Sequence, residues 1–338
     1  MLSIIICSTH STTDDALVSN IAATVGVDYE IVHIDNSQNT YNIFQAYNRG
    51  VALAKGDLLC FMHEDVQFHT QDWGKVVEGY LALDDVGAIG VAGGNVVLDS
   101  LDWRFYGFGT MYLMQGTTTV EERPNYYIAH PANRPYHHAF SMVAVLDGVW
   151  MCMRRELFRE IRFDDEHFHS FHLYDTDICM QINKAGKNNF VTYDVLLEHK
   201  SMGTFSESFK DSLSVFFQKW KTDLPMIKGM AVSQQEIDEA LAKAQSVFDE
   251  RLEEDALRMA IRGVYSDKQK GLPCRRFTSA ERRLIDETAW ECRRSYIKDS
   301  QMPVAEVWYA VKEYLRSPYA SRRCSLFFKF LWHRILHR

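Results

Sequence analysis

The chain has 338 residues, 46% of them hydrophobic and 24% charged, with a formal net charge of −8. This length and composition exclude a wholly disordered chain and allow two domains. The balance of 45 Asp and Glu against 37 Lys and Arg argues against nucleic acid as a partner. No run of about 18 apolar residues predicts a membrane span, and the first residues do not form a signal peptide. Seven widely spaced cysteines without a Cys-x-x-Cys pair favour a reducing compartment, so we expect a cytoplasmic location.

The first 65 residues alternate between strand and helix patterns. Apolar runs at residues 2–7, 30–34 and 58–62 predict buried strands. Between them, residues 16–24 and 43–54 have the spacing of helices. This order predicts a parallel sheet with right-handed crossovers.

Polar residues follow each of these three strands. They are Ser8-Thr9-His10, Asp35-Asn36-Ser37 and His63-Glu64-Asp65. Ligands of open α/β sheets bind at the carboxyl ends of the strands, so three polar ends in a row predict a binding site. Taken alone, the acidic pair Glu64-Asp65 is better explained as a helix cap or a solvated turn, although such carboxylates also bind Mg²⁺ and Mn²⁺.

The middle of the chain continues the alternation. Further strands are predicted at residues 88–92, 143–153 and 190–197, and Glu198-His199 follows the last of them. A helix is predicted over residues 174–184, with Asp175 and Asp177 in its first turn, where the helix dipole favours carboxylates. Residues 99–136 read as a long loop rich in aromatic side chains. Beyond about residue 205, charged helices are expected at residues 234–262 and 278–296.

The ordered set of motifs resembles a known family. A helix containing Asn48-Arg49-Gly50 and ending in Ala54-Lys55-Gly56-Asp57 lies between Asp35-Asn36-Ser37 and the acidic strand end. Together with the opening strand, these motifs resemble the nucleotide-sugar half of GT-A glycosyltransferases, and more narrowly the family-2-type inverting enzymes. The family's usual Asp-x-Asp appears as His63-Glu64-Asp65, and a His-x-Asp-Val version occurs in one branch, which the chain also resembles at Leu146-Asp147-Gly148.

The resemblance covers about residues 1–205 and implies the fold. We therefore expect an α/β, GT-A (Rossmann-like) catalytic domain over residues 1–205, with a mainly parallel central sheet flanked by helices. Residues 206–338 would form a helical C-terminal region with a basic and aromatic tail.

The resemblance also implies a divalent cation, Mn²⁺ or Mg²⁺, and a nucleoside-diphosphate sugar as donor. Asp65 and His199 would hold the ion, which would bridge the diphosphate. A lone histidine at a strand end is otherwise more often structural, and the role of position 63 stays open. The residues expected at the donor are Ser8, Thr9, His10, Asp35, Ser37, Asn48, His63 and Glu64.

Similar enzymes place Glu-Asp at the start of a helix, with the Asp as the catalytic base. Here Tyr174-Asp175 fills that position, so the resemblance assigns the base to Asp175, which would deprotonate the acceptor hydroxyl. The plain alternative is a pair of carboxylates that complement the helix dipole. The residues expected near the acceptor are Asp147, Gly148, Trp150 and Asp177.

A group of histidines matches no standard zinc pattern. Its members are His130, His137, His138, His167, His169 and His172. With Trp150 and the loop aromatics they are expected to shape an acceptor pocket or to belong to the core.

The resulting hypothesis is a metal-dependent inverting glycosyltransferase that moves a sugar to a hydroxyl of a glycan or lipid-linked acceptor, in surface polysaccharide synthesis. One alternative is a non-catalytic protein that binds nucleotide sugars or glycans with a decayed site. Another is a sugar nucleotidyltransferase, against which the absence of Gly, Lys and Arg from residues 8–15 argues. The tail at residues 321–338 predicts either peripheral contact with the inner face of a membrane or packing on protein, including dimerisation.

Overall fold

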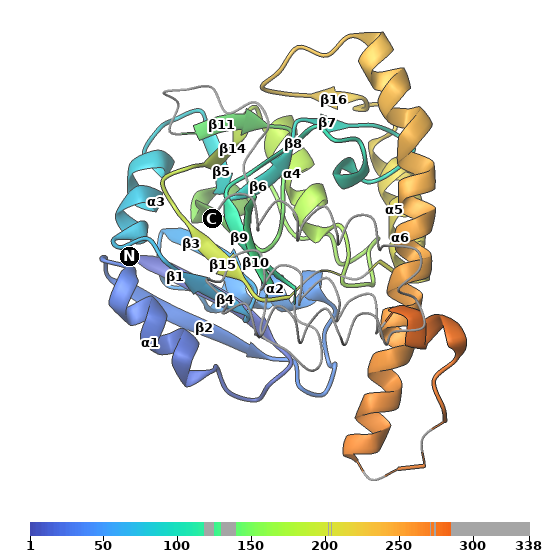
Figure 1. Ribbon diagram of the computed structural model, residues 1–338. Helices are drawn as coiled ribbons and strands as arrows, with labels where there is room; N and C mark the ends of the chain where they lie inside the picture. The colour runs from blue at the N-terminus through green and yellow to red at the C-terminus, as the bar shows by residue number, and fades with distance from the viewer. Residues whose placement is uncertain are drawn as a thin grey trace, which may run out of the picture. The chain divides into compact units, whose positions relative to one another are not determined.

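The computed structural model describes residues 1–117, 125–129, 140–201, 203, 205–270, 272–273 and 275–284 (Figure 1). The chain divides into two compact units. One comprises Met1–Thr118 and Tyr126–Met259, and the other comprises Thr119–Asn125 and Ala260–Arg338. The main sheet and the candidate site both belong to the first unit.

A seven-stranded sheet forms the centre of this unit, in the order β11-β14-β5-β13-β3-β1-β2. Its strands are β1 (Leu2–Ser8), β2 (Tyr29–Asp35), β3 (Leu58–Met62), β5 (Val86–Gly90), β11 (Phe140–Val143), β13 (Trp150–Arg154) and β14 (Asn188–Thr192). Five strands run parallel, while β13 and β11 run against their neighbours. The predicted fold class, a mainly parallel sheet flanked by helices, is confirmed.

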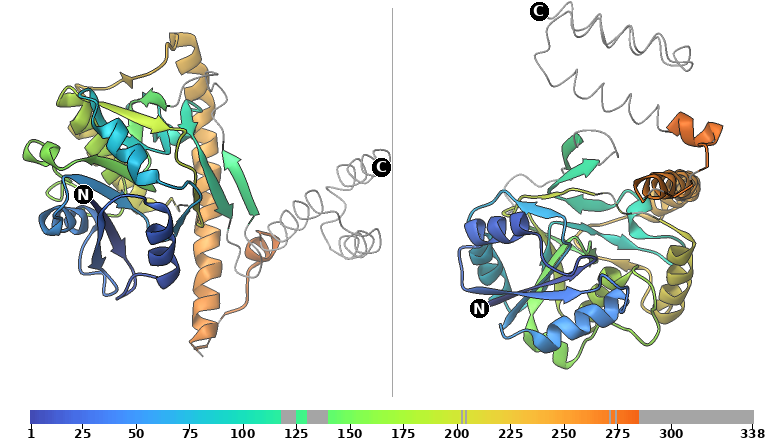
Figure 2. Two further views of the ribbon diagram at one scale, coloured as in Figure 1. Left: turned by 90° about the vertical axis from the view of Figure 1, so that its left-hand side faces the viewer. Right: turned by 90° about the horizontal axis from the view of Figure 1, so that it is seen from below.

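Helices cover both faces of this sheet (Figure 2). They are α1 (Asp15–Thr24), α2 (Ile43–Leu53), α3 (Trp73–Leu81) and α4 (Tyr174–Lys184). Ile4 and Ile6 of β1 pack with α1 and α3, whereas Ile5 packs with α2 and α4. All three isoleucines are fully buried, as expected for a strand covered on both faces. Of these helices, only α3 has no counterpart in the sequence-based prediction.

The Asn48-Arg49-Gly50 motif fixes α2 in this arrangement. A Cβ atom on Gly50 would lie 2.3 Å from Cγ2 of Ile5, so glycine allows the helix to approach β1 closely. The Asn48 amide donates to the carbonyl of Phe163 at 2.7 Å and accepts from its N–H at 3.2 Å. Asn48, expected at the donor, therefore joins α2 to the chain before α4.

A second, four-stranded sheet has the order β10-β9-β15-β4. Its members are β4 (Val66–Phe68), β9 (Leu113–Thr117), β10 (Asn125–Ala129) and β15 (Leu197–His199). The single strand predicted at residues 190–197 is wrong: the chain leaves the main sheet after Thr192 and enters the second sheet at Leu197. This transfer pairs His199 with Val66, next to Asp65.

Short strands complete the unit. They are β6 (Ala92–Gly94), β8 (Gly109–Met111) and β12 (Val145–Leu146) in one sheet, and β7 (Val96–Val97) and β16 (Met226–Ile227) in another. Gly93 and Gly94 lie in β6 and do not close the predicted strand 88–92, which ends at Gly90. The predicted loop 99–136 contains strands and the 3₁₀ helix η1 (Trp103–Phe105), and a second 3₁₀ helix, η2 (Arg155–Arg159), follows β13.

The C-terminal part is helical where it is described, with α5 (Glu207–Trp220) and α6 (Gln234–Gln269). Phe209, Leu213 and Phe216 of α5 belong to the core that also contains α2 and α4. The core of the first unit thus continues past residue 205, and a catalytic domain ending there stays a prediction. In the described part of the chain, no helix combines the length and apolar character needed to cross a membrane. The tail at residues 321–338 lies outside the described residues.

A buried ion pair attaches α5 to α4. The fully buried carboxylate of Asp177 accepts from Trp220 Nε1 at 2.8 Å and lies 2.7 Å from Lys219 Nζ. Burial raises the pKa of Asp177 despite the opposing effect of Lys219. Asp177, expected near the acceptor, instead connects two helices.

Replacement of Lys219 by Met should lower the free energy of unfolding by about 3 kcal/mol or more, because Asp177 would stay buried without its cation. Urea denaturation of the purified protein measures this. The matched control is Lys221→Met, at an exposed position just after the same helix, which should change stability by about 0.5 kcal/mol or less. Equal effects of the two substitutions would contradict the assigned role.

Candidate active site

The carboxyl ends of β1 and β3 meet through Glu64. Ser8 Oγ donates to one oxygen of Glu64, while the backbone N–H and the hydroxyl of Thr9 donate to the other at 3.2 and 2.8 Å. His10 Nδ1 lies 3.2 Å from the same carboxylate. Burial opposes ionisation, but these hydrogen bonds lower the pKa of Glu64. Four of the residues expected at the donor therefore form one cluster.

The end of β2 lies beside this cluster, since Asp35 pairs with Ser8 across the sheet. The exposed Asp35 side chain accepts from the N–H of Ser37 at 2.9 Å, and this hydrogen bond lowers its pKa. The sequence thus predicted correctly that three polar strand ends lie at one edge of the sheet.

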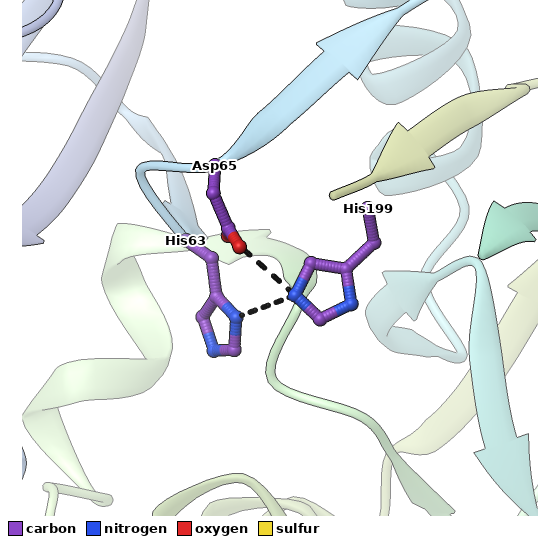
Figure 3. Close-up of side chains that lie close together, drawn as sticks. All are labelled: His63, Asp65 and His199. Carbon is purple, nitrogen blue, oxygen red and sulfur yellow. Dashed lines mark hydrogen bonds and ion pairs between the residues drawn. The ribbon is translucent and has the colours of Figure 1, made fainter. Parts of the chain in front are cut away.

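His63, Asp65 and His199 come together just beyond β3 (Figure 3). His63 Nδ1 lies 3.3 Å from His199 Nε2, and Asp65 Oδ1 lies 3.5 Å from the same nitrogen. One donor atom from each residue lies within 4.8 Å of the others. The Lys200 N–H donates to the carbonyl of Asp65 at 3.0 Å, which fixes the two segments next to each other. We call these three residues the His-Asp-His triad.

The triad is electrostatically suited to a cation. Burial, reinforced by the neighbouring His199, lowers the pKa of His63 and favours a neutral imidazole. Burial opposes ionisation of Asp65, but its hydrogen bond to His199 outweighs this effect and lowers the pKa of Asp65. A neutral imidazole and an ionised carboxylate are the forms that bind metal ions.

Tyr174 connects the triad to the start of α4. Its hydroxyl lies 3.0 Å from His63 Nε2. The same hydroxyl packs against Gly148, where a Cβ atom would lie 2.0 Å from it. Gly148 therefore leaves room for the Tyr174 side chain, and Asp175 follows one residue after it.

Asp175 is buried and its oxygens accept several hydrogen bonds. Oδ2 accepts from the N–H of Gly148 at 2.9 Å and from Arg104 Nη2 at 3.0 Å. Oδ1 accepts from the N–H of Thr176 at 2.8 Å. Asp147 Oδ2 accepts from the same Arg104 Nη2 at 2.8 Å. Asp175, Asp147 and Gly148, all predicted from the sequence, thus lie together, with Arg104 between the two carboxylates.

Other predicted residues lie elsewhere. Trp150 is fully buried and packs edge-on against Trp73 at 6.0 Å between ring centroids, which agrees with the core role left open for it and not with an acceptor pocket. His167 binds Asp164, and His172 packs against Phe209. His130, His137 and His138 lie outside the described residues.

Sequence reasoning missed Arg104 and Phe171. Arg104 belongs to a segment predicted as a loop, and its partners are 43 and 71 residues away in the sequence. Phe171 is 54% exposed, although its ring lies 6.3 Å from that of His63 and 6.0 Å from that of Tyr174. The available signal for Phe171 was its position in the sequence, three residues before the Tyr174-Asp175 pair that resembles the family motif.

The fold and this site define a class: α/β proteins with a mainly parallel sheet and a carboxylate–imidazole cluster at the carboxyl ends of its strands. The chain belongs to the glycosyltransferase-like family, whose model matches residues 3–218. No curated protein matches the sequence.

Solved structures of glycosyltransferases are similar at low identity. GalNAc-T7 with UDP, GalNAc and Mn²⁺ is 14% identical over 59% of this chain and 43% of that chain, with a TM-score of 0.41. The mannosyltransferase PcManGT from Pyrobaculum calidifontis, in complex with GDP-Man and Mn²⁺, is 14% identical over 58% and 56%, with a TM-score of 0.36. The catalytic domain of Drosophila beta1,4-galactosyltransferase 7 with xylobiose is 13% identical over 56% and 63%, with a TM-score of 0.32. The chain thus spans less than two thirds of each of these structures, and such distant likenesses carry no argument about its residues.

Proposed function

We propose that the protein is a metal-dependent inverting glycosyltransferase that uses a nucleoside-diphosphate sugar. The observation that carries this proposal is the His-Asp-His triad, joined through Tyr174 to the carboxylate of Asp175. A group that binds the diphosphate and a group that accepts a proton would then lie on adjacent parts of one site. Family membership supports the reaction class.

The donor atoms of the triad fit a divalent ion. Ligand atoms about 2.1 Å from one ion lie about 3.0 to 3.5 Å from one another. The separations of 3.3 Å from His63 to His199 and 3.5 Å from His199 to Asp65 agree with this. Two imidazoles favour Mn²⁺ over Mg²⁺, which prefers oxygen ligands. When bound, the ion would stabilise the negative charge on the departing nucleoside diphosphate.

The chain's own residues would perform the other tasks. Glu64 holds the loop after β1 in place for the nucleotide, and Asp35 would accept a hydrogen bond from the base or ribose. Asp175 would take the proton of the acceptor hydroxyl as its oxygen attacks the anomeric carbon. A single displacement of this kind inverts the configuration at that carbon. We propose a hydroxyl of a glycan or lipid-linked acceptor, in the synthesis of a surface polysaccharide.

The replacement of a carboxylate by His63 motivated the alternative of a decayed, non-catalytic site. The position of His63 within the triad removes that motive, because the imidazole is itself a suitable ligand. Calorimetry with UDP-, GDP- and dTDP-sugars, with and without Mn²⁺, tests the choice. We expect one donor to bind only with Mn²⁺ and to be hydrolysed slowly. Absence of binding to any donor would contradict the proposal.

Substitution of His63 or His199 by Ala, or of Asp65 by Asn, should lower Mn²⁺ affinity by more than about 100-fold. Each substitution removes a ligand, whereas a change to a residue that only contacts a ligand typically costs about 10- to 100-fold. Titration of free Mn²⁺ by electron paramagnetic resonance measures this without any assay of activity. His69→Ala is the matched control, since His69 is exposed and pairs with Glu198 outside the triad. Unchanged affinity in the His63 variant would exclude it as a ligand.

Asp175→Asn should reduce kcat by about 10²- to 10⁴-fold, because an amide cannot take the acceptor proton. Binding of the donor with Mn²⁺ should stay as in the wild type, since Asp175 lies outside the triad. Single-turnover assays and donor calorimetry separate the two effects. Transfer at near-normal rates would show that another group is the base.

Phe171 is the exposed aromatic surface we propose for the sugar acceptor, since aromatic faces pack well against sugar C–H groups. Phe171→Ala should raise the acceptor KM by about 2- to 10-fold, whereas Phe171→Tyr should keep it near the wild-type value. Leu83→Ala removes a comparably exposed apolar side chain elsewhere and serves as the control. An acceptor KM that does not respond to Phe171→Ala would reject this contact.

A further inference from the structure

One guanidinium connects three carboxylates next to the proposed base. Arg104 Nη1 donates to both oxygens of Asp102, at 3.0 and 3.1 Å. Its Nη2 donates to Asp147 at 2.8 Å and to Asp175 at 3.0 Å, and its Nε also reaches Asp147, at 3.2 Å. Asp102 and Asp175 are buried, while Asp147 and Arg104 are each 26% exposed at the side chain. We call these four residues the Arg104 cluster.

Without Arg104, the carboxylates of Asp147 and Asp175 would lie close to each other with no cation between them. Because Oδ2 of Asp147 and Oδ2 of Asp175 bind the same nitrogen, they lie at most about 6 Å apart, where like charges disfavour joint ionisation. Burial alone would raise the pKa of Asp147, but Arg104 lowers it to about 2. The positive charge of the guanidinium therefore offsets the repulsion between the two carboxylates that it binds.

The hydrogen bonds of Asp175 distinguish its two oxygens. Oδ2 accepts at good distances from Arg104 and from the N–H of Gly148. Oδ1 accepts from Thr176 alone among the described residues, at 2.8 Å from its N–H and at 3.3 Å from its hydroxyl. Because that hydroxyl rotates and forms the longer bond, Oδ1 is the oxygen that can accept from another donor in its place.

We propose that Arg104 is a positioning residue of the transfer reaction, which fixes Oδ2 of Asp175 so that Oδ1 receives the acceptor proton, and whose charge offsets that of the neighbouring Asp147. This inference rests on the proposed role of Asp175. In the step, the acceptor O–H proton moves to Oδ1 and the oxygen's electron pair forms the new bond to the anomeric carbon. The bond from that carbon to the diphosphate oxygen breaks, and its electrons leave with the nucleoside diphosphate.

Among the residues that the structure describes, the remaining titratable groups around Asp175 do not supply a comparable cation. They are His63, His172, Tyr47, Tyr174, Cys179 and Asp177. Burial lowers the pKa of both histidines and raises that of the two tyrosines and the cysteine, so all five favour their neutral forms. Asp177 is paired with Lys219.

The test is a comparison of Arg104→Met and Arg104→Lys in full-length protein with Mn²⁺ and the donor found by calorimetry. In Arg104→Met, we expect the acid limb of kcat/KM to move up by about 1 pH unit or more, because loss of the cation favours the protonated carboxyl. We also expect kcat on the plateau to fall by about 10-fold or more, with donor Kd unchanged. Arg104→Lys should keep the acid limb near the wild-type position and recover part of kcat, since it restores charge without the planar fork.

Arg162→Met is the control, because Arg162 is exposed and, among the residues that the structure describes, its side chain pairs only with the nearby carboxylates of Asp165 and Glu166. A purely structural role would lower the amount of active enzyme without moving the acid limb, and this result would overturn the inference. A weaker donor Kd with an unmoved limb would also overturn it and would assign Arg104 to the donor. If Asp175→Asn stays active, the proposed base itself fails, whatever Arg104 does.

Discussion

The antiparallel pairing of β4 with β15 is the contact on which the candidate site depends. It places Leu197 opposite Phe68 and His199 opposite Val66, and the Lys200 N–H then binds the carbonyl of Asp65. His63 and His199 are 136 residues apart in the sequence, and this strand pairing places their ring nitrogens 3.3 Å apart. Both segments rest on a buried core, since Val66, Phe68 and Leu197 are almost fully buried. A slip of one residue would turn His199 to the other face of the strand and remove it from the triad.

The first turn of α4 shows how one local pattern serves two purposes. Asp175 and Asp177 are two residues apart, so their side chains leave the helix in different directions. Asp175 faces Arg104 and the loop after β12, whereas Asp177 faces Lys219 and Trp220 of α5. Each of these two buried carboxylates is paired with a cation, which offsets the cost of removing the carboxylate from water. The same helix therefore attaches α5 to the core and holds the proposed base.

Sequence patterns predicted the features that depend on neighbouring residues. Three apolar runs became β1, β2 and β3, and the polar residues after them meet because parallel strands end at one edge. Features set by distant residues were missed or misplaced. Trp150 follows the Asp147-Gly148 motif, but its side chain points into the core and packs against Trp73. The apolar run at residues 190–197 contains parts of two strands that belong to different sheets. Arg104 gave no local signal of its place in the site, because Asp147 and Asp175 belong to other segments of the chain.

The histidine at position 63 changes the charge of the proposed metal site. A carboxylate in its place would add a second negative charge beside Asp65, whereas the neutral imidazole leaves the triad with one. A divalent ion held by the triad would then keep a larger share of its positive charge for the diphosphate. The contact between His63 Nε2 and the Tyr174 hydroxyl orients the ring so that Nδ1 faces His199. Tyr174 directly precedes the proposed base, so its contact with His63 links the start of α4 to the triad.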